Sequence, residues 1–274
     1  MRLGGFSADL KNYSAEITDV HKSVVKFFWL HKTHSFFIFV IPVCSSIAVG
    51  YAVENVTFAL IPLVIPVISY WRVHSHIKKL FYTNLATELE CAYSESGNVP
   101  TSGQLFTFGR SHTVRNVLSG TYKDIPFRLF DYSYEIGSGK NRHTYYYTAA
   151  ELPVAGVLPK ILCIPDGWNL VSFIDTWMPE GYSPLSLEGG FNNEFNVYVA
   201  KDQEIEALQI LEPNVMEKLM DGFDAFGFEC LDSHVYLFTK GAGKDNRESV
   251  LGAFTLLKRF ADLLLPELQS FLRN

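Results

Sequence analysis

The sequence is poor in charged residues and has no excess of positive charge. Only 19% of its 274 residues are charged, against about 25% in ordinary globular domains. The formal net charge is −6 and the isoelectric point is about 5.8, whereas nucleic-acid-binding domains carry a basic footprint. We therefore expect no nucleic-acid partner.

Cysteine is scarce too, and catalytic motifs are missing. Four cysteines in 274 residues are too few for a disulfide-built scaffold. The stretch Gly137-Ser138-Gly139-Lys140 suggests a phosphate-binding loop, but Tyr134 stands where that motif needs glycine and Asn141 where it needs Ser or Thr. We predict no catalytic residue set, no metal site and no cofactor.

Long apolar stretches are present, and they lie in one region. The mean hydropathy of the chain is +0.09, and its longest apolar stretches lie in residues 35–73. There Ser35–Val53 and Val56–Trp71 are apolar over 19 and 16 residues, separated by Glu54-Asn55. A bilayer core of about 30 Å needs about 20 helical residues. The pattern predicts a two-span transmembrane hairpin; a helical hairpin buried in a folded core is the alternative. The predicted membrane-spanning residues include Phe36, Pro42, Gly50, Phe58, Pro62 and Pro66.

Basic residues flank both predicted spans, and the short connection between the spans has none. Cytoplasmic flanks carry the excess of lysine and arginine, so we predict a two-span protein of the cell inner membrane with both termini in the cytoplasm. Residues 1–79 carry a net charge of +4 and residues 80–274 a net charge of −10. The membrane-flanking basic residues are Lys22, Lys26, Lys32, Arg72, Lys78 and Lys79.

The whole chain is expected to have four parts. Residues 1–34 form a cytoplasmic N-terminal helix, residues 35–73 the hairpin, residues 74–94 a helical stalk and residues 95–274 a cytoplasmic α+β domain. In that domain, runs of aromatic and β-branched residues precede helical periods, which predicts a mainly antiparallel sheet with C-terminal helices. The expected strands are Val114–Tyr122, Ile125–Glu135, Thr144–Leu152, Lys160–Ile164 and Asn196–Ala200, followed by a hairpin that turns at Asp232-Ser233. Helices are expected from Asp202, from Pro213 and over Asn246–Arg273.

Aromatic residues of the predicted domain are the candidates for binding. Alternation of acids and aromatics in residues 131–135, opposite three consecutive tyrosines, indicates a strand pair that could line a tyrosine-rich pocket. Tryptophans in an irregular loop are suited to anchor a partner or to enter a membrane interface. The candidate binding residues are Tyr132, Tyr134, Tyr146, Trp168 and Trp177.

Three functions are compatible with this pattern. The first is a membrane-anchored cytoplasmic binding or scaffold module, with the lipid bilayer and a protein partner or second copy as its partners. The second is a membrane-tethered hydrolase, because paired carboxylates can act as acid and base; its candidates are Asp131, Asp166, Asp175 and Glu180. The third is an accessory subunit of a membrane complex that packs through small residues, namely Ser45, Ser46, Ala48 and Gly50.

Two blocks of the sequence resemble a known family. The first is GTYKDIPFRLF at residues 120–130, with Thr144 and the strand at 145–152. The second is FNNEFNVYV at residues 191–199, followed by Asp202, Ala207, Leu211, Pro213, Met216 and Leu219. They are similar to a family of uncharacterised bacterial membrane proteins, catalogued as a domain of unknown function. The resemblance covers about residues 10–240. It implies an N-terminal helix, a two-span hairpin and an α+β domain, and it assigns no site residues.

Overall fold

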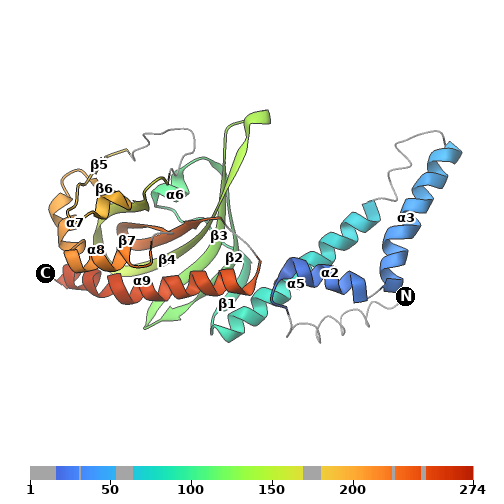
Figure 1. The fold of residues 1–274 in the computed structure, drawn as a ribbon, viewed down its shortest axis with the longest axis horizontal. Coiled ribbons are helices and arrows are strands. Elements are labelled where there is room, and N and C mark those ends of the chain that lie inside the picture. Colours follow the sequence, from blue (N-terminus) through green and yellow to red (C-terminus); the bar gives the residue numbers. More distant parts are fainter. Residues whose placement is uncertain are drawn as a thin grey trace. The chain divides into compact units, whose positions relative to one another are not determined.

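The chain forms two compact units. The computed structural model describes residues 17–30, 32–53, 64–168, 180–223, 226–241 and 245–273. The helical unit comprises Met1–Leu89 and Asp245–Arg247, and the sheet unit comprises Glu90–Lys244 and Glu248–Asn274. The elements of both are labelled in Figure 1.

The helical unit is built from α2 (Val20–Leu30), α3 (Lys32–Val53) and α5 (Val64–Glu88). Helix α2 buries Val20, Ser23, Val24 and Phe27, which recur every three to four residues and so lie on one face of the helix. Helix α5 buries Val73, Ile77, Phe81 and Leu85 at intervals of four residues. These two apolar stripes form the core of the unit. Of the residues 1–34 predicted as one helix, the described part holds α2 and the first residues of α3.

Three residues that come late in the sequence complete the helical unit. The Val20 amide donates to the Asp245 carbonyl at 2.9 Å, and the Arg247 amide donates to the Thr18 carbonyl at 2.9 Å. The Asp245 carboxylate pairs with Lys78 Nζ at 3.0 Å and accepts from the Tyr82 hydroxyl at 3.0 Å. Arg247 forms a two-pronged ion pair with Glu88. Strand-like pairing and charge thus join residues 245–247 to α2 and α5.

The predicted membrane hairpin is not supported. Across the parts of the chain that the structure describes, no helix is both long enough and apolar enough to cross a membrane. Residues 54–63, which include the predicted turn, Phe58 and Pro62, lie outside those parts. Helix α3 continues through Pro42. The Ser45 and Ser46 hydroxyls both donate to the Pro42 carbonyl, at 2.9 and 2.8 Å.

The helical stalk predicted for residues 74–94 is shorter than expected. Helix α5 ends at Glu88, and Glu90 has a φ of +56°, a left-handed conformation that a helix cannot continue through. Ala92–Ser96 then forms β1 rather than helix, because it pairs antiparallel with β2.

The sheet unit contains a seven-stranded sheet in which every strand pair is antiparallel. This arrangement confirms the predicted α+β class with a mainly antiparallel sheet and a C-terminal helix. The order is β1-β2-β3-β4-β6-β5, with β7 paired to β4. The strands are β1, β2 (Arg110–Tyr122), β3 (Ile125–Ile136), β4 (His143–Pro165), β5 (Tyr182–Pro184), β6 (Phe195–Ala200) and β7 (Gly227–Lys240).

Strand β4 pairs with three other strands. It contains both of the strands predicted at Thr144–Leu152 and Lys160–Ile164. Its first part pairs with β3, its last part with β6, and β7 pairs along most of its length. The register shifts between Pro153 and Leu158. Gly156 lies in this irregular stretch with a φ of +136°, and a Cβ there would come within 2.6 Å of Leu272. A non-glycine residue would meet both backbone strain and a collision.

The two strands predicted on either side of Asp232-Ser233 do not pair with each other as a hairpin, because both arms pair with β4. Strand β7 is continuous from Gly227 to Lys240. Asp232 has a φ of +53° and lies opposite Leu158, where the β4–β7 register shifts. The residues with turn character therefore form a bulge at which β7 bends back on itself. A Cβ placed on Gly227 would lie 2.7 Å from the ring of Phe238 in the other arm of the strand.

Helices cover the two faces of the sheet unequally. Helix α9 (Arg247–Arg273) runs unbroken through Pro266 and lies along one face, as Figure 1 shows for the red helix. There Phe254 contacts Phe127 and Phe260 contacts Phe228, with ring centroids 5.6 and 5.3 Å apart. The one-turn helix α6 (Gln104–Thr107) covers the opposite face. Helices α7 (Glu204–Ile210) and α8 (Pro213–Met220) follow β6.

Candidate functional site

The helical unit exposes an unusual amount of apolar surface. Trp29, Val67 and Trp71 are 65%, 67% and 69% exposed. Among the described residues of the sheet unit, the exposed large apolar side chains are Tyr146, Val157, Ile205 and Leu208. Contiguous exposed apolar patches beyond a few hundred Å² mark membrane or protein contacts. The exposed apolar surface consists of Val25, Trp29, Leu30, Phe36, Val40, Ile41, Val43, Ile47, Val64, Ile65, Val67, Ile68, Tyr70 and Trp71.

The predicted flanking cations are found on the same unit. Lys22, Lys26, Arg72 and Lys79 are exposed. Lys78 is engaged by Asp245, and the side chain of Lys32 lies outside the described part. Of the predicted spanning residues, Phe36 is exposed whereas Pro42 and Pro66 are buried. The burial of Gly50 is not described, and Phe58 and Pro62 lie outside the described residues.

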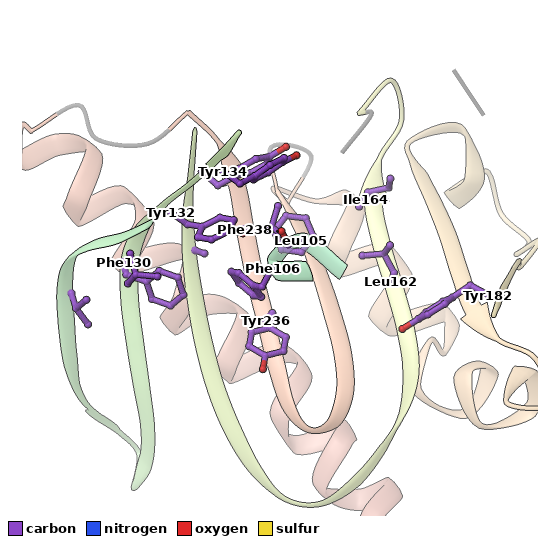
Figure 2. Packing of buried hydrophobic residues seen from close by; sticks show 14 residues of the cluster. Leu105, Phe106, Phe130, Tyr132, Tyr134, Leu162, Ile164, Tyr182, Tyr236 and Phe238 are labelled. Carbon is purple, nitrogen blue, oxygen red and sulfur yellow. Dashed lines mark hydrogen bonds between the residues drawn. The ribbon is translucent and has the colours of Figure 1, made fainter. Parts of the chain in front are cut away.

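The five predicted binding residues do not form one surface. Tyr132 and Tyr134 are 1% and 0% exposed and belong to the core under α6, as Figure 2 shows. Tyr146 is 56% exposed, because Tyr145 and Tyr147 on either side of it turn toward Tyr134. The first two tyrosines are therefore placed for packing rather than for surface contact.

The predicted binding tryptophans are described only in part. Trp168 is half-buried against the core, with Lys240 Nζ 5.0 Å from its ring centroid. Trp177 lies outside the described residues.

The acids proposed for hydrolysis are also separate from one another. Asp131 accepts from Asn116 Nδ2 at 2.6 Å, and Asp166 accepts from Asn196 Nδ2 at 3.2 Å. Glu180 is exposed, and Asp175 is outside the described part. A cleft of about 430 Å³ lies between the β2–β3 turn, the bulge of β4 and the end of α9, and of the described acids neither Asp131 nor Asp166 nor Glu180 lines it. No described contact favours the hydrolase.

A buried carboxyl group that sequence reasoning missed lies under α6. Glu229 is 0% exposed. Its Oε2 accepts from the Gln104 amide at 2.7 Å, and its Oε1 accepts from the Tyr182 hydroxyl at 3.3 Å. Burial raises the pKa of Glu229 to about 7, and the two hydrogen bonds and the charge of Lys160 oppose that rise in pKa. Glu229 thus holds the start of α6 against the sheet.

Neighbouring groups extend this polar layer. The hydroxyls of Ser102 and Tyr236 bond at 2.9 Å, and burial raises the pKa of Tyr236 to about 12. Glu151, 9% exposed, pairs with Arg128 through two guanidinium nitrogens, and His234 Nε2 lies 3.6 Å from its Oε1. Hydrogen bonds and opposite charges compensate for burying these groups, so the layer fixes α6 and β7 in place.

The chain thus contains an antiparallel sheet unit of the α+β class and a helical unit that exposes apolar side chains. No model of a known protein family matches the chain, and no curated protein matches its sequence. One solved structure is similar: the crystal structure of the mycobacterial trehalose monomycolate transport factor A, TtfA. The TM-score is 0.45 and the sequence identity 13%, over 67% of this chain and 92% of that one. A likeness at this level assigns neither family nor activity, and the resemblance to the two-span bacterial family stays a prediction.

Proposed function

We propose that the chain is a membrane-associated binding or scaffold protein. The helical unit attaches to a lipid bilayer, and the sheet unit contacts a protein partner or a second copy of the chain. The observation that carries the proposal is the exposed apolar surface of α2, α3 and α5. Removing such side chains from water stabilises the attached state by about 25 cal/mol per Å², whereas leaving them in water favours aggregation.

The attachment is tested by separating the membranes of cells that express the full chain and washing them with alkaline carbonate. We expect the native chain to stay with the membranes. Ile47→Asp together with Val67→Asp should shift it into the wash by about tenfold or more, because carboxylates are costly among acyl chains. Both residues are exposed, so neither substitution opens a cavity in the protein core.

The matched control uses two apolar residues of the sheet unit. Val157 and Ile205 are 74% and 71% exposed, so Val157→Asp together with Ile205→Asp adds the same charge at equally exposed positions. This variant should remain with the membranes. A native chain that the carbonate wash removes completely would refute stable attachment through the helical unit.

Within this proposal, the finer topology follows from the sequence. Two spans over residues 35–73, with both termini in the cytoplasm, place only the neighbourhood of Glu54 outside the inner membrane. We expect a reporter that is active only in the cytoplasm to work when fused after Asn274. The same reporter inserted beside Glu54 should be inactive. Activity at both positions would mean that the chain does not cross the membrane.

A further inference from the structure

Exposed apolar residues, then an aromatic pair, then cations follow one another along α5. Beginning at its first residue, Val64, Val67 and Ile68 are exposed; Tyr70 and Trp71 come next. Exposed Arg72 and Lys79 follow within the next two to three turns. Such an order, from acyl-chain residues through aromatic rings to cations, is typical of a helix that passes through a membrane interface.

Helix α2 presents the same order in the opposite chain direction. Lys22 and Lys26 are exposed near its start, and Trp29 and Leu30 are exposed at its end. The residues of α3 that follow in the chain include exposed Ile41 and Ile47. Two helices of opposite direction would show mirrored sequences of residue types if both crossed one interface.

Contacts within the unit align the two tryptophans. The rings of Phe28 and Tyr70 are stacked, with centroids 6.2 Å apart, and each lies next in sequence to a tryptophan, Trp29 or Trp71. At the other end of α2, the Val20 amide and the Tyr82 hydroxyl bond to the same residue, Asp245. Helices α2 and α5 are therefore antiparallel. Trp29 and Trp71 are therefore at a similar height along the helix pair, and Lys22 and Lys26 lie on the same side of them as Arg72 and Lys79.

We propose that Trp29 and Trp71 mark the depth at which the helical unit meets a bilayer, and that Lys22, Lys26, Arg72 and Lys79 select anionic phospholipid headgroups there. The inference rests on the membrane attachment proposed above and names the lipid class that it favours. Lysine and arginine can extend their aliphatic stems along apolar surface while their charges reach the headgroups. Each cation near an anionic lipid surface strengthens the attraction about fivefold.

The test measures lipid contact through tryptophan fluorescence of the reconstituted full chain. In a background with Trp168→Phe and Trp177→Phe, Trp29 and Trp71 are the two remaining tryptophans. The vesicles contain phosphatidylcholine and phosphatidylglycerol in equal amounts, with bromine, which quenches tryptophan, on the acyl chains of one lipid or the other. We expect brominated phosphatidylglycerol to quench about twofold more than brominated phosphatidylcholine, reflecting its enrichment beside the cations.

Removing the four cations should abolish that preference. Lys22→Gln, Lys26→Gln, Arg72→Gln and Lys79→Gln together should make the two quenching values equal, whereas Lys22→Arg, Lys26→Arg and Lys79→Arg should preserve the difference. Lys140→Gln with Lys201→Gln, at exposed cations of the sheet unit, should also preserve it. Far-ultraviolet circular dichroism checks that each variant keeps its helices.

The outcomes separate this inference from the proposed function. If both brominated lipids quenched strongly and equally in the Trp168→Phe and Trp177→Phe background with all four cations present, the headgroup preference would be overturned and attachment would stand. Quenching by neither lipid would overturn both, because the tryptophans would then lie away from the acyl chains. A preference that persists in the variant without the four cations would refute their assigned role.

Discussion

Replacing Glu229 by glutamine is expected to remove a loss of stability that the native protein shows as the pH rises from about 5 to 8. The ordinary pKa of this carboxyl is 4.5, and burial raises its pKa to about 7 in the folded chain. Below pH 4.5 the Glu229 carboxyl is protonated in both the folded and the unfolded chain, so the free energy of unfolding is at its full value. Between the two pKa values the unfolded chain loses its proton first. The free energy of unfolding therefore falls by about 3 kcal/mol and levels off above pH 7.

Glutamine suits this site because it stays neutral and keeps a side-chain oxygen to accept from the Gln104 amide or the Tyr182 hydroxyl. At pH 8 Glu229→Gln should be more stable than the native chain by up to about 3 kcal/mol. At pH 4 the two should be nearly equal. Urea unfolding of the full chain in detergent, followed by near-ultraviolet circular dichroism of the tyrosine-rich core, measures the difference.

Glu188→Gln is the matched control, because it makes the same substitution at an exposed position. Its unfolding free energy should follow that of the native chain at every pH. If native and Glu229→Gln proteins lost stability in parallel over this pH range, Glu229 would not be the group whose burial makes folding depend on pH.

The parts of the fold that the sequence predicts are those decided by local pattern. Strands β2 and β3 were expected within a few residues of their observed bounds. Their alternation is regular, and Lys123 and Asp124 both adopt the positive φ of a tight hairpin turn. The loop at residues 137–142 joins β3 to β4 as expected. In α8, Pro213 occupies the first turn as predicted.

The errors lie where distant pairing overrides local signals. The strands predicted at Thr144–Leu152 and Lys160–Ile164 are one strand, because β7 pairs with β4 on both sides of the bulge. Asp232-Ser233 suggested the turn of a two-stranded hairpin, yet the arms on either side of it pair with β4. The partners of Glu229 are 125 and 47 residues away in the sequence. One acid within the apolar run Gly227–Leu231 was the available signal, but it could not identify Gln104 or Tyr182 as partners.

The second large effect is expected from Phe106→Ala. Phe106 is 3% exposed, and its ring centroid lies 4.9 Å from that of Tyr132, 5.1 Å from Tyr236 and 6.1 Å from Phe130, an arrangement visible in Figure 2. Truncation leaves a cavity among aromatic rings that cannot all move inward. We expect a loss of about 3–5 kcal/mol in the free energy of unfolding, measured by urea unfolding as above.

The position of Phe106 makes this substitution act on Glu229 as well. A Cβ placed on Gly103 would lie 2.9 Å from the Phe106 ring and 3.3 Å from Glu229 Oε2, so the ring and the carboxyl flank the same glycine. Water that enters the cavity would lower the cost of ionising Glu229. The stability gained from Glu229→Gln at pH 8 should therefore be smaller in the Phe106→Ala background, a coupling that a double-mutant cycle measures.

Phe108→Ala provides the comparison within the same segment. Phe108 is only half-buried, and its ring centroid lies 6.5 Å from that of Tyr134. Phe108→Ala should lower the free energy of unfolding by roughly half as much as Phe106→Ala, because less apolar area is removed from contact. It should also leave the pH dependence due to Glu229 unchanged. Equal losses of unfolding free energy for the two substitutions would mean that Phe106 does not anchor α6. The Glu229 hydrogen bond would then hold this segment without help from the aromatic core.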